Sequence, residues 1–393
     1  MGNGFERIIP RHGTSSFKYD AREQIFGGKD VIPLWVADMD FAAPAAVQRA
    51  LAERAAHPIY GYTVFPESLY DALLGWLRQR HNWRVSRESL LLCPGVVPSL
   101  HAAIFALTRD DAAVIVQPPI YPPFLAAPKI TGRKLLPNPL KFEQGRYLFD
   151  LDGFEQCAAQ GARLLLLCSP HNPVGRVWQA GELQALLDIC QRYAVTVVCD
   201  EIHADLVYPG DRHVPLAKLA DGKVNVIAAV APSKTFNIPG LGLSALVVPD
   251  DSDRNAINHV FDRLHVSASN PFSIAAFEAA YRDGMPWLDA LLDYLAATRD
   301  AVRDFLQQQL PKIKLIEPQG TYLLWLDCRG MRLGDKQLKQ FFVREAGVGL
   351  SPGILFGEGG SGFMRMNIAA PRSVIIRALE NISRAERSRR PSA

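Results

Sequence analysis

The segment Val224-Asn-Val-Ile-Ala-Ala-Val-Ala-Pro-Ser-Lys-Thr-Phe-Asn237 is a mostly apolar run that is followed closely by a lysine. Three earlier parts of the chain contain a similar continuous apolar run, at 113–117, 163–168 and 195–199. Continuous runs, in contrast to alternating ones, are typical of strands that are covered on both faces, as in a parallel sheet. We therefore predict four strands of a parallel sheet.

Helical stretches fit between these runs. One is predicted at 98–108, where it opens behind Pro98 and Ser99, and another at 182–193, where apolar residues recur at helical spacing. Because strands and helices alternate, we predict an α/β fold with a mostly parallel central sheet and helices on both faces.

The pattern changes beyond residue 285. A long helical stretch runs from Trp287 to about Leu310, and a predicted strand at 321–327 follows it. A helix near 335–346 and a strand at 363–369 complete this part of the chain. Such a mixture predicts a second, smaller domain of the α+β type.

The length of the chain also favours two domains. Its 393 residues are long for one domain and short for three, and a hydrophobic content of 48% is enough for a sizeable core. The segment before about Pro44 has little helical periodicity and is expected to pack across the second domain. We predict a large domain at 46–285 and a small domain that 1–45 and 286–393 form together.

Charge and composition narrow the possible partners. With 43 basic and 40 acidic residues the net charge is +3, which argues against a nucleic-acid-binding surface and favours a small substrate. The first thirty residues contain no secretory apolar region, and no segment reaches the ~18 apolar residues of a membrane span. We therefore expect a cytoplasmic protein. The six cysteines form no C-x-x-C pair, so we expect reduced core residues and no metal site.

Each predicted strand is followed by a residue that is suited to chemistry. In chain order these residues are Tyr121, Asn172, Asp200 and Lys234. In open α/β sheets, ligands bind beyond the carboxyl ends of the strands. We therefore expect these four side chains to belong to one site.

Lys234 and Asp200 suit an aldehyde cofactor. A neutral lysine amine forms a Schiff base with a carbonyl, and burial lowers the lysine pKa from its usual ~10.4. The Asp200 carboxylate can pair with a protonated pyridine nitrogen. Taken alone, Lys234 also fits a solvated lysine and Asp200 a helix cap. Together they indicate pyridoxal 5'-phosphate.

Three further features fit the same cofactor and an amino-acid substrate. Asn172 can donate its amide to a phenolate oxygen, and Tyr121 can stack on a ring, although an Asn-Pro turn and a loop aromatic also occur for structural reasons. The turn Cys93-Pro-Gly-Val-Val-Pro98 precedes a predicted helix N-terminus, which binds anions. Arg365 can hold an α-carboxylate bidentately, or can be a partnered surface arginine.

These residues belong to longer motifs that resemble a known family. The chain resembles the fold-type I, aspartate-aminotransferase-like pyridoxal phosphate enzymes, and within them the MalY/PatB-type cystathionine β-lyases. The resemblance spans nearly the whole chain. It is carried by Leu34-Trp-Val-Ala-Asp-Met-Asp-Phe41, Cys168-Ser-Pro-His-Asn-Pro-Val-Gly-Arg-Val-Trp178, Asp200-Glu-Ile-His-Ala-Asp205, Ser233-Lys-Thr-Phe-Asn237 and Gly320-Thr-Tyr-Leu-Leu-Trp-Leu-Asp327.

The resemblance implies a role for each candidate residue. Lys234 would bond to the cofactor aldehyde and carry protons, and Tyr121 would stack on the ring and share the catalytic work. The resemblance further implies a homodimer with shared active sites, in which Tyr62 reaches the phosphate of the neighbouring subunit. The remaining implied contacts are Asp200 and Asn172 to the ring, Gly95, Val96, Val97 and Ser233 to the phosphate, and Arg365, Asn172 and the backbone at Ala37 to the substrate carboxylate.

Three positions depart from the general aminotransferase pattern. His203 stands where a tyrosine usually meets the ring hydroxyl, Gly242 where an arginine usually meets the phosphate, and Ala231 in place of a serine. His203 is therefore the fourth residue that we expect at the ring. His203 and Gly242 fit the β-lyase branch, whereas Ala231 leaves the phosphate contacts open.

The resemblance favours one reaction over two others. It implies a carbon–sulfur β-lyase that converts cystathionine or a related cysteine S-conjugate to a thiol, pyruvate and ammonia. An aminotransferase needs the same lysine, and the chemistry of the residues alone does not separate the two. A regulatory protein-binding role, alongside catalysis or instead of it, is the hypothesis from a different class.

Overall fold

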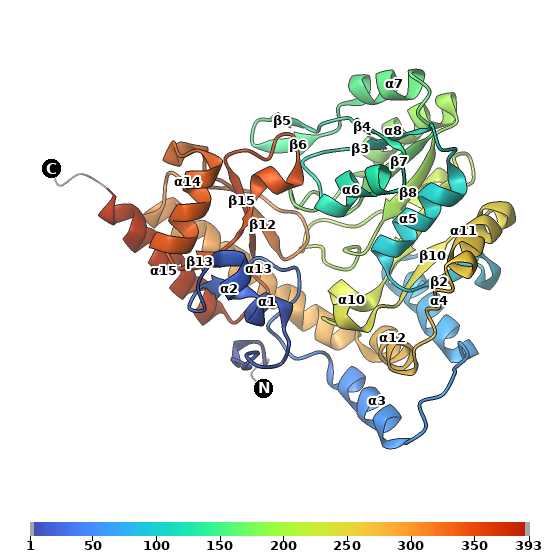
Figure 1. The fold of residues 1–393 in the computed structure, drawn as a ribbon, viewed down its shortest axis with the longest axis horizontal. Coiled ribbons are helices and arrows are strands. Elements are labelled where there is room, and N and C mark those ends of the chain that lie inside the picture. Colours follow the sequence, from blue (N-terminus) through green and yellow to red (C-terminus); the bar gives the residue numbers. More distant parts are fainter. Residues whose placement is uncertain (1–3, 390–393) are drawn as a thin grey trace.

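The larger of two main sheets has seven strands (Figure 1). The structure is a computed structural model, and it describes residues 4–389. Five neighbouring strands are parallel, whereas β10 runs antiparallel to both of its neighbours. In spatial order the strands are β2 (Leu90–Cys93), β10 (Ser244–Val247), β9 (Val226–Val230), β8 (Thr196–Asp200), β7 (Leu164–Cys168), β3 (Ala113–Val116) and β4 (Lys134–Pro137).

The four predicted strands are β3, β7, β8 and β9, and the predicted α/β class is confirmed. Apart from Thr196 and Asp200 at the two ends of β8, their residues are apolar, because neighbouring side chains enter different cores: Leu164 and Leu166 belong to one apolar cluster, Leu165 and Leu167 to another. Helices cover both faces. The first cluster includes α5 (Val96–Leu107), α6 (Pro122–Ile130) and α11 (Asp251–Arg263), and the second includes α7 (Leu151–Ala159), α8 (Ala180–Tyr193) and α9 (Leu216–Ala220).

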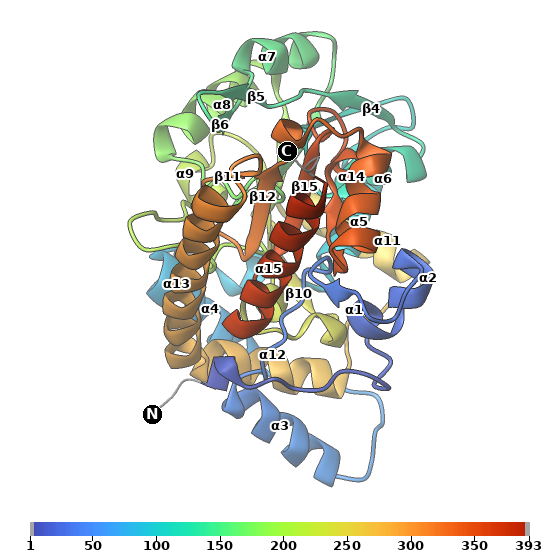
Figure 2. The ribbon, with the colours of Figure 1, turned by 90° about the vertical axis from the view of Figure 1, so that its left-hand side faces the viewer.

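The second sheet has four antiparallel strands and two long helices beside it. Figure 2 shows α13 (Met285–Gln309) and α15 (Arg372–Ser388) side by side in front of this sheet. A short helix, α14 (Asp335–Gln340), continues into a π-helical turn at Phe341–Glu345. The strands in spatial order are β11 (Lys314–Ile316), β12 (Leu323–Asp327), β15 (Phe363–Asn367) and β14 (Ser351–Pro352).

The N-terminal segment joins this second region. Its strand β1 (Ile32–Pro33) pairs in parallel with β13 (Val348–Gly349), as expected for a segment that packs across the smaller part. Two short helices, α1 (Phe17–Asp20) and α2 (Arg22–Phe26), were not anticipated, since helices of four or five residues leave little periodicity. The domain boundaries at 45/46 and 285/286 stay a prediction.

Helices from distant parts of the chain connect the two sheets. α3 (Ala45–Ala56) and α4 (Glu67–His81) pack on α12 (Pro271–Asp283), and their apolar cluster continues into α13, β12 and β15. The segment 57–66 connects α3 and α4 and extends away from the rest of the protein (Figure 1, bottom). Other short elements include α10 (Pro232–Thr235) and the hairpin of β5 (Lys141–Glu143) and β6 (Arg146–Leu148).

All six cysteines are buried and free, in agreement with their predicted place in the core. No helix within residues 4–389 combines the length and the apolar character that a membrane crossing requires. Cytoplasmic residence stays a prediction.

The central strands should depend on apolar burial. Ile227 in β9 is fully buried, whereas Ile130 at the end of α6 is 70% exposed. We expect Ile227→Ala to lower the free energy of unfolding by about 2–5 kcal/mol, because the lost methyl groups leave a cavity between strand and helix. Ile130→Ala is the matched control and should change it by less than about 0.5 kcal/mol. Urea unfolding of the two variants measures this, and equal losses would contradict the assignment of β9 to the core.

Candidate active site

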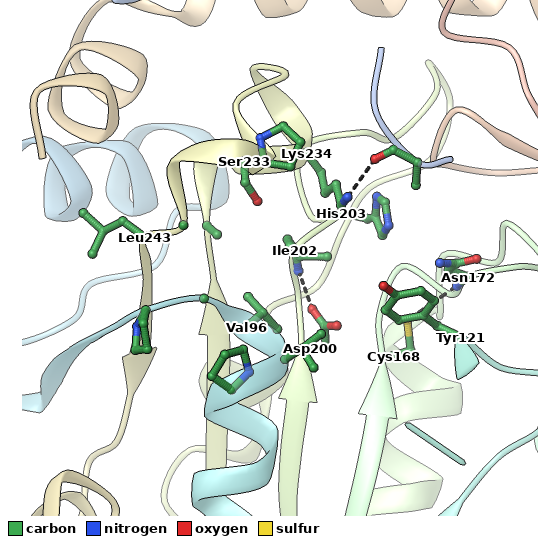
Figure 3. A pocket seen from close by; sticks show the side chains of 18 residues that line it. Val96, Tyr121, Cys168, Asn172, Asp200, Ile202, His203, Ser233, Lys234 and Leu243 are labelled. Carbon is green, nitrogen blue, oxygen red and sulfur yellow. Dashed lines mark hydrogen bonds between the residues drawn. The ribbon is translucent and has the colours of Figure 1, made fainter. Parts of the chain in front are cut away.

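A cavity of about 230 Å³ lies at the carboxyl ends of β7, β8 and β9 (Figure 3). The ends of these parallel strands share one edge of the sheet, which is why residues far apart in the sequence meet there. All the predicted site residues except Tyr62 and Arg365 line the cavity. The lining residues are Ala37, Pro94, Gly95, Val96, Val97, Pro98, Tyr121, Cys168, Asn172, Asp200, Ile202, His203, Ala231, Ser233, Lys234, Pro239, Gly242 and Leu243.

Lys234 projects into the cavity from the short helix α10, directly after β9. Its Nζ donates a hydrogen bond of 2.7 Å to the carbonyl oxygen of Ala37. Burial lowers the pKa of Lys234 to about 8, because the charged form loses its hydration. A lysine with this pKa has a large neutral fraction near neutrality, and the neutral amine is the nucleophile.

Asp200 is the last residue of β8 and is buried. Its Oδ1 accepts the backbone N–H of Ile202 at 3.0 Å. Burial raises the pKa of Asp200 to about 7, since the cavity solvates a carboxylate poorly. A cation placed against this side chain would restore the charged form, so the position suits a carboxylate that pairs with a protonated ring nitrogen.

Arg365 lies beside Asn172, just outside the cavity lining. It is buried in β15, where its guanidinium donates to Asn172 Oδ1 at 2.9 Å and to the Trp35 carbonyl at 2.8 Å. Burial lowers the pKa of Arg365 to about 10. Among residues 4–389 no carboxylate forms an ion pair with it, and its Nε has no hydrogen-bond partner. A buried, unneutralised guanidinium next to a cavity is an available site for an anion.

The opposite end of the cavity has the features of an anion site. Val96 and Val97 form the first turn of α5, behind Gly95 at a φ of +142°, a conformation that suits glycine. Ser233 also lines this cavity. The N-terminus of a twelve-residue helix offers backbone N–H groups and a positive dipole end to a phosphate.

His203 is buried and its Nδ1 has no hydrogen-bond partner among the described residues. Burial lowers the pKa of His203 to about 3, and the neighbouring charges of Lys234 and Arg365 act in the same direction. The imidazole is therefore neutral at physiological pH, and it can donate one hydrogen bond and accept another.

Tyr62 lies away from the cavity of its own chain. It is in the segment between α3 and α4, and its side chain is fully exposed. The predicted function of Tyr62 requires a second copy of the chain, so its absence from the lining fits that prediction without testing it.

Two residues around the site, Tyr322 and Asn237, were not predicted from the sequence. Tyr322 is fully buried and its hydroxyl donates to the Ala37 carbonyl at 3.0 Å, so that Ala37 accepts from both Tyr322 and Lys234. Asn237 binds the backbone on either side of Asp40. Both residues lie inside motifs that carried the family resemblance, and this could have marked them as candidates. Their spacing in the sequence did not predict hydrogen bonds to Ala37 or its neighbours.

Comparison with known proteins identifies the family. Residues 29–382 match the model of the aminotransferase class I and II family. The chain belongs to this family. It is 41% identical to cystathionine β-lyase PatB of Bacillus subtilis, over 97% of this chain and 99% of that protein. The resemblance to the MalY/PatB type is thereby confirmed.

Two solved structures are similar over almost their whole length. A PLP-bound putative aminotransferase from Clostridium difficile superposes with a TM-score of 0.96 at 38% identity, covering 98% of this chain and 100% of that one. Cystalysin from Treponema denticola, whose structure contains a pyridoxal 5'-phosphate cofactor, superposes with a TM-score of 0.95 at 33% identity, covering 99% and 100%. The predicted fold-type I architecture is confirmed.

Proposed function

We propose that this protein is a pyridoxal 5'-phosphate-dependent carbon–sulfur β-lyase. It cleaves L-cystathionine or a related cysteine S-conjugate to a thiol, pyruvate and ammonia. The observation that carries the proposal is the full-length similarity to a cystathionine β-lyase, together with a partly buried lysine of lowered pKa in the cavity. An aminotransferase is the second candidate, because it would use the same fold and the same lysine. One of the similar solved structures is a putative aminotransferase.

The chemistry of the cavity fits the cofactor. The uncharged fraction of Lys234 suits an aldehyde, the buried Asp200 suits a protonated pyridine nitrogen, and the first turn of α5 with Ser233 suits a phosphate. His203 and Asn172 are neutral hydrogen-bonding groups for the ring hydroxyl. When bound, pyridoxal phosphate supplies an aldehyde that bonds reversibly to an amine and a ring that withdraws electrons from Cα.

Lys234 is the proton carrier of the proposed reaction. With the cofactor and substrate bound, the Lys234 amine would remove the Cα proton of the substrate. The electron pair of the Cα–H bond forms the Cα=Cβ bond, and the Cβ–S bond breaks with its electrons on sulfur. The three-carbon remainder reacts with water to give pyruvate and ammonia.

Tyr121 and Arg365 act on the two ends of the substrate. Burial raises the pKa of Tyr121, so its hydroxyl keeps its proton, and either it or the protonated Lys234 can deliver a proton to the departing sulfur. Arg365, with Asn172 and the backbone N–H of Ala37, binds the α-carboxylate. Among the described residues Arg365 has no ion-pair partner and its Nε is free, which supports this role.

Product analysis tests the reaction. We expect the purified holoenzyme to form pyruvate from cystathionine without any added 2-oxo acid, and to form no glutamate from an amino acid plus 2-oxoglutarate. Lys234→Ala should remove both the turnover and the visible absorption band that borohydride abolishes, because base and aldehyde partner are lost together. Circular dichroism checks that the variant stays folded. Glutamate formation by the wild type would instead indicate an aminotransferase, and turnover by Lys234→Ala would contradict the assigned base.

The pKa of Lys234 predicts how cofactor uptake depends on pH. Burial disfavours the charged amine, so the neutral form of Lys234 predominates above about pH 8. An exposed lysine would still be mostly charged at this pH. We expect the rate at which the apoprotein takes up pyridoxal phosphate to rise with pH through a midpoint near 8. Stopped-flow absorption measures this rate, with a small alkylamine in the same buffers as the control. A midpoint above 10 would show that the cavity does not lower the lysine pKa.

A homodimer with shared sites is the second part of the proposal. The segment 57–66 exposes four large apolar side chains, a pattern that is typical of a surface which a partner covers. A second copy of the chain is the proposed occupant, because Tyr62 in this segment is exposed and does not line the active-site cavity of its own chain. The exposed side chains are Ile59, Tyr60, Tyr62 and Val64.

Hybrid dimers test whether Tyr62 acts in the partner's site. We expect Lys234→Ala and Tyr62→Ala homodimers to be impaired, and a hybrid of the two to regain lyase activity. If Tyr62 acts across the interface, one site of the hybrid has both native side chains. If it acts within its own chain, neither site does. Activity after mixing, dissociation and reassociation of the differently tagged variants distinguishes the two. The same procedure with two batches of the Lys234→Ala variant is the control and should give no activity.

A further inference from the structure

The segment 35–41 lies between the lysine and the arginine of the site, and both bind it. Lys234 donates to the carbonyl of Ala37 at 2.7 Å, and Arg365 donates to the carbonyl of Trp35 at 2.8 Å. These two side chains come from different parts of the fold, Lys234 from the short helix α10 and Arg365 from β15 of the smaller sheet. The segment therefore links the two side chains.

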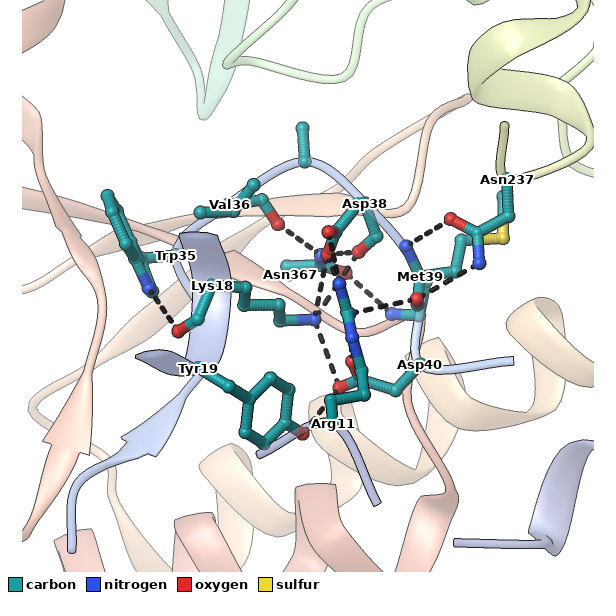
Figure 4. A network of polar contacts seen from close by, with 12 residues as sticks. Arg11, Lys18, Tyr19, Trp35, Val36, Asp38, Met39, Asp40, Asn237 and Asn367 are labelled. Carbon is teal, nitrogen blue, oxygen red and sulfur yellow. Dashed lines mark hydrogen bonds and ion pairs between the residues drawn. The ribbon is translucent and has the colours of Figure 1, made fainter. Parts of the chain in front are cut away.

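An asparagine accompanies the lysine on the same segment. Asn237 follows Lys234 by three residues, and its Oδ1 accepts the N–H of Met39 at 2.9 Å. Its Nδ2 donates to the carbonyls of Met39 at 3.0 Å and Phe41 at 2.7 Å (Figure 4). Asn237 has a φ of +56°, a left-handed conformation that asparagine tolerates better than most residues. The side chain thus binds the backbone of the segment with both amide donors and its oxygen.

A second asparagine accompanies the arginine. Asn367 follows Arg365 by two residues on β15, so the two side chains leave the same face of the strand. Its Nδ2 donates to the carbonyls of Val36 and Asp38, both at 2.6 Å, and its Oδ1 accepts the N–H of Ala369 at 2.7 Å (Figure 4). Asn367 is buried, so water does not replace these bonds.

Charged side chains hold the segment from a third side. Arg11 pairs with both Asp38 and Asp40 at 2.6 Å, and the fully buried Lys18 pairs with Asp40 at 3.0 Å. Figure 4 shows these groups on the side of the segment away from Asn237. The two asparagines bind the same segment, Asn237 from the residues after Lys234 and Asn367 from β15.

We propose that Asn237 and Asn367 are positioning residues that set the spacing between Lys234 and Arg365 through the segment 35–41. The bond from Lys234 to Ala37 involves the amine that would react with the cofactor, whereas the asparagine bonds involve no reacting atom. The inference rests on the proposed function, in which the substrate amine bonds beside Lys234 while its carboxylate binds Arg365. Both ends of an α-amino acid fit only if this spacing is held.

Ligand discrimination tests the proposal. L-alanine and ethylamine both carry the amine, only L-alanine has the carboxylate, and neither has a leaving group. The dissociation constant of ethylamine divided by that of L-alanine, both measured from the change of the visible cofactor absorption, shows how well the amine and carboxylate sites act together. We expect Asn237→Ala and Asn367→Ala each to reduce this ratio by about tenfold or more, since a misplacement of 1 Å can cost ~10²-fold. A general loss of stability would weaken both ligands alike and leave the ratio unchanged.

Asn138→Ala is the matched control. Asn138 is also buried and its Nδ2 donates to the carbonyl of Asp150 at 3.1 Å, but it does not line the cavity. It should lower the thermal unfolding temperature and keep the wild-type ratio. If an alanine variant fails to fold, Asn237→Asp or Asn367→Asp replaces it, because aspartate keeps the shape and the acceptor and loses both donors. The aspartate variants should also reduce the ratio.

The outcomes separate this inference from the proposed function. A wild-type protein without a cofactor absorption band would overturn the proposed function itself. A wild type that binds the cofactor and discriminates, with folded asparagine variants that keep its ratio within about twofold, would overturn only the positioning role. A reduced ratio in both asparagine variants, with an unchanged ratio in Asn138→Ala, would support it.

Discussion

The parallel alignment of β7, β8 and β9 is the constraint on which the rest of the site depends. Hydrogen bonding in parallel register places Cys168 beside Asp200 and Asp200 beside Ala229, so the carboxyl ends of three strands form one edge. Each strand is apolar on both sides because helices cover both faces, which leaves this edge as the place where polar side chains gather. The cavity follows from this arrangement of the backbone.

Burial is the largest cause of the pKa shift for each of the ionisable groups that matter here. It lowers the pKa of Lys234, His203 and Arg365 and raises that of Asp200. All four shifts favour the neutral form, as expected where an apolar setting replaces water. The cavity solvates the side chains of Lys234 and Asp200 poorly. Lys234, which is easily deprotonated, can react with an aldehyde, and Asp200, which has no paired cation among the described residues, can pair with a pyridinium. Burying Lys234 and Asp200 is unfavourable in the free protein. The proposed ligand would offset this free-energy cost when it binds.

The alternation of apolar runs and helical spacing was enough to predict the central strands, the class of the fold and the residue that follows each strand. It was weaker where tertiary contacts override local preference. The helices α1 and α2 are too short to show a period, and the predicted helix at 335–346 ends as a π-helical turn from Phe341. Tyr322 and Asn367 were not predicted as site residues. Tyr322 donates to the carbonyl of Ala37 and Asn367 to that of Val36, and each of these partners is more than 280 residues away in the sequence.

The sequence by itself determined which residues stand at the ends of the strands, because an apolar run and the polar residue after it are local facts of the chain. It also determined the family, because the motifs around Lys234 and Asp200 are long enough to be specific. Only the tertiary structure decided how Lys234 and Arg365 are linked, since the segment 35–41 reaches them from the far end of the chain. Hydrogen bonds to backbone carbonyls hold it there, and such bonds depend on proximity in space and leave no pattern in the order of residues.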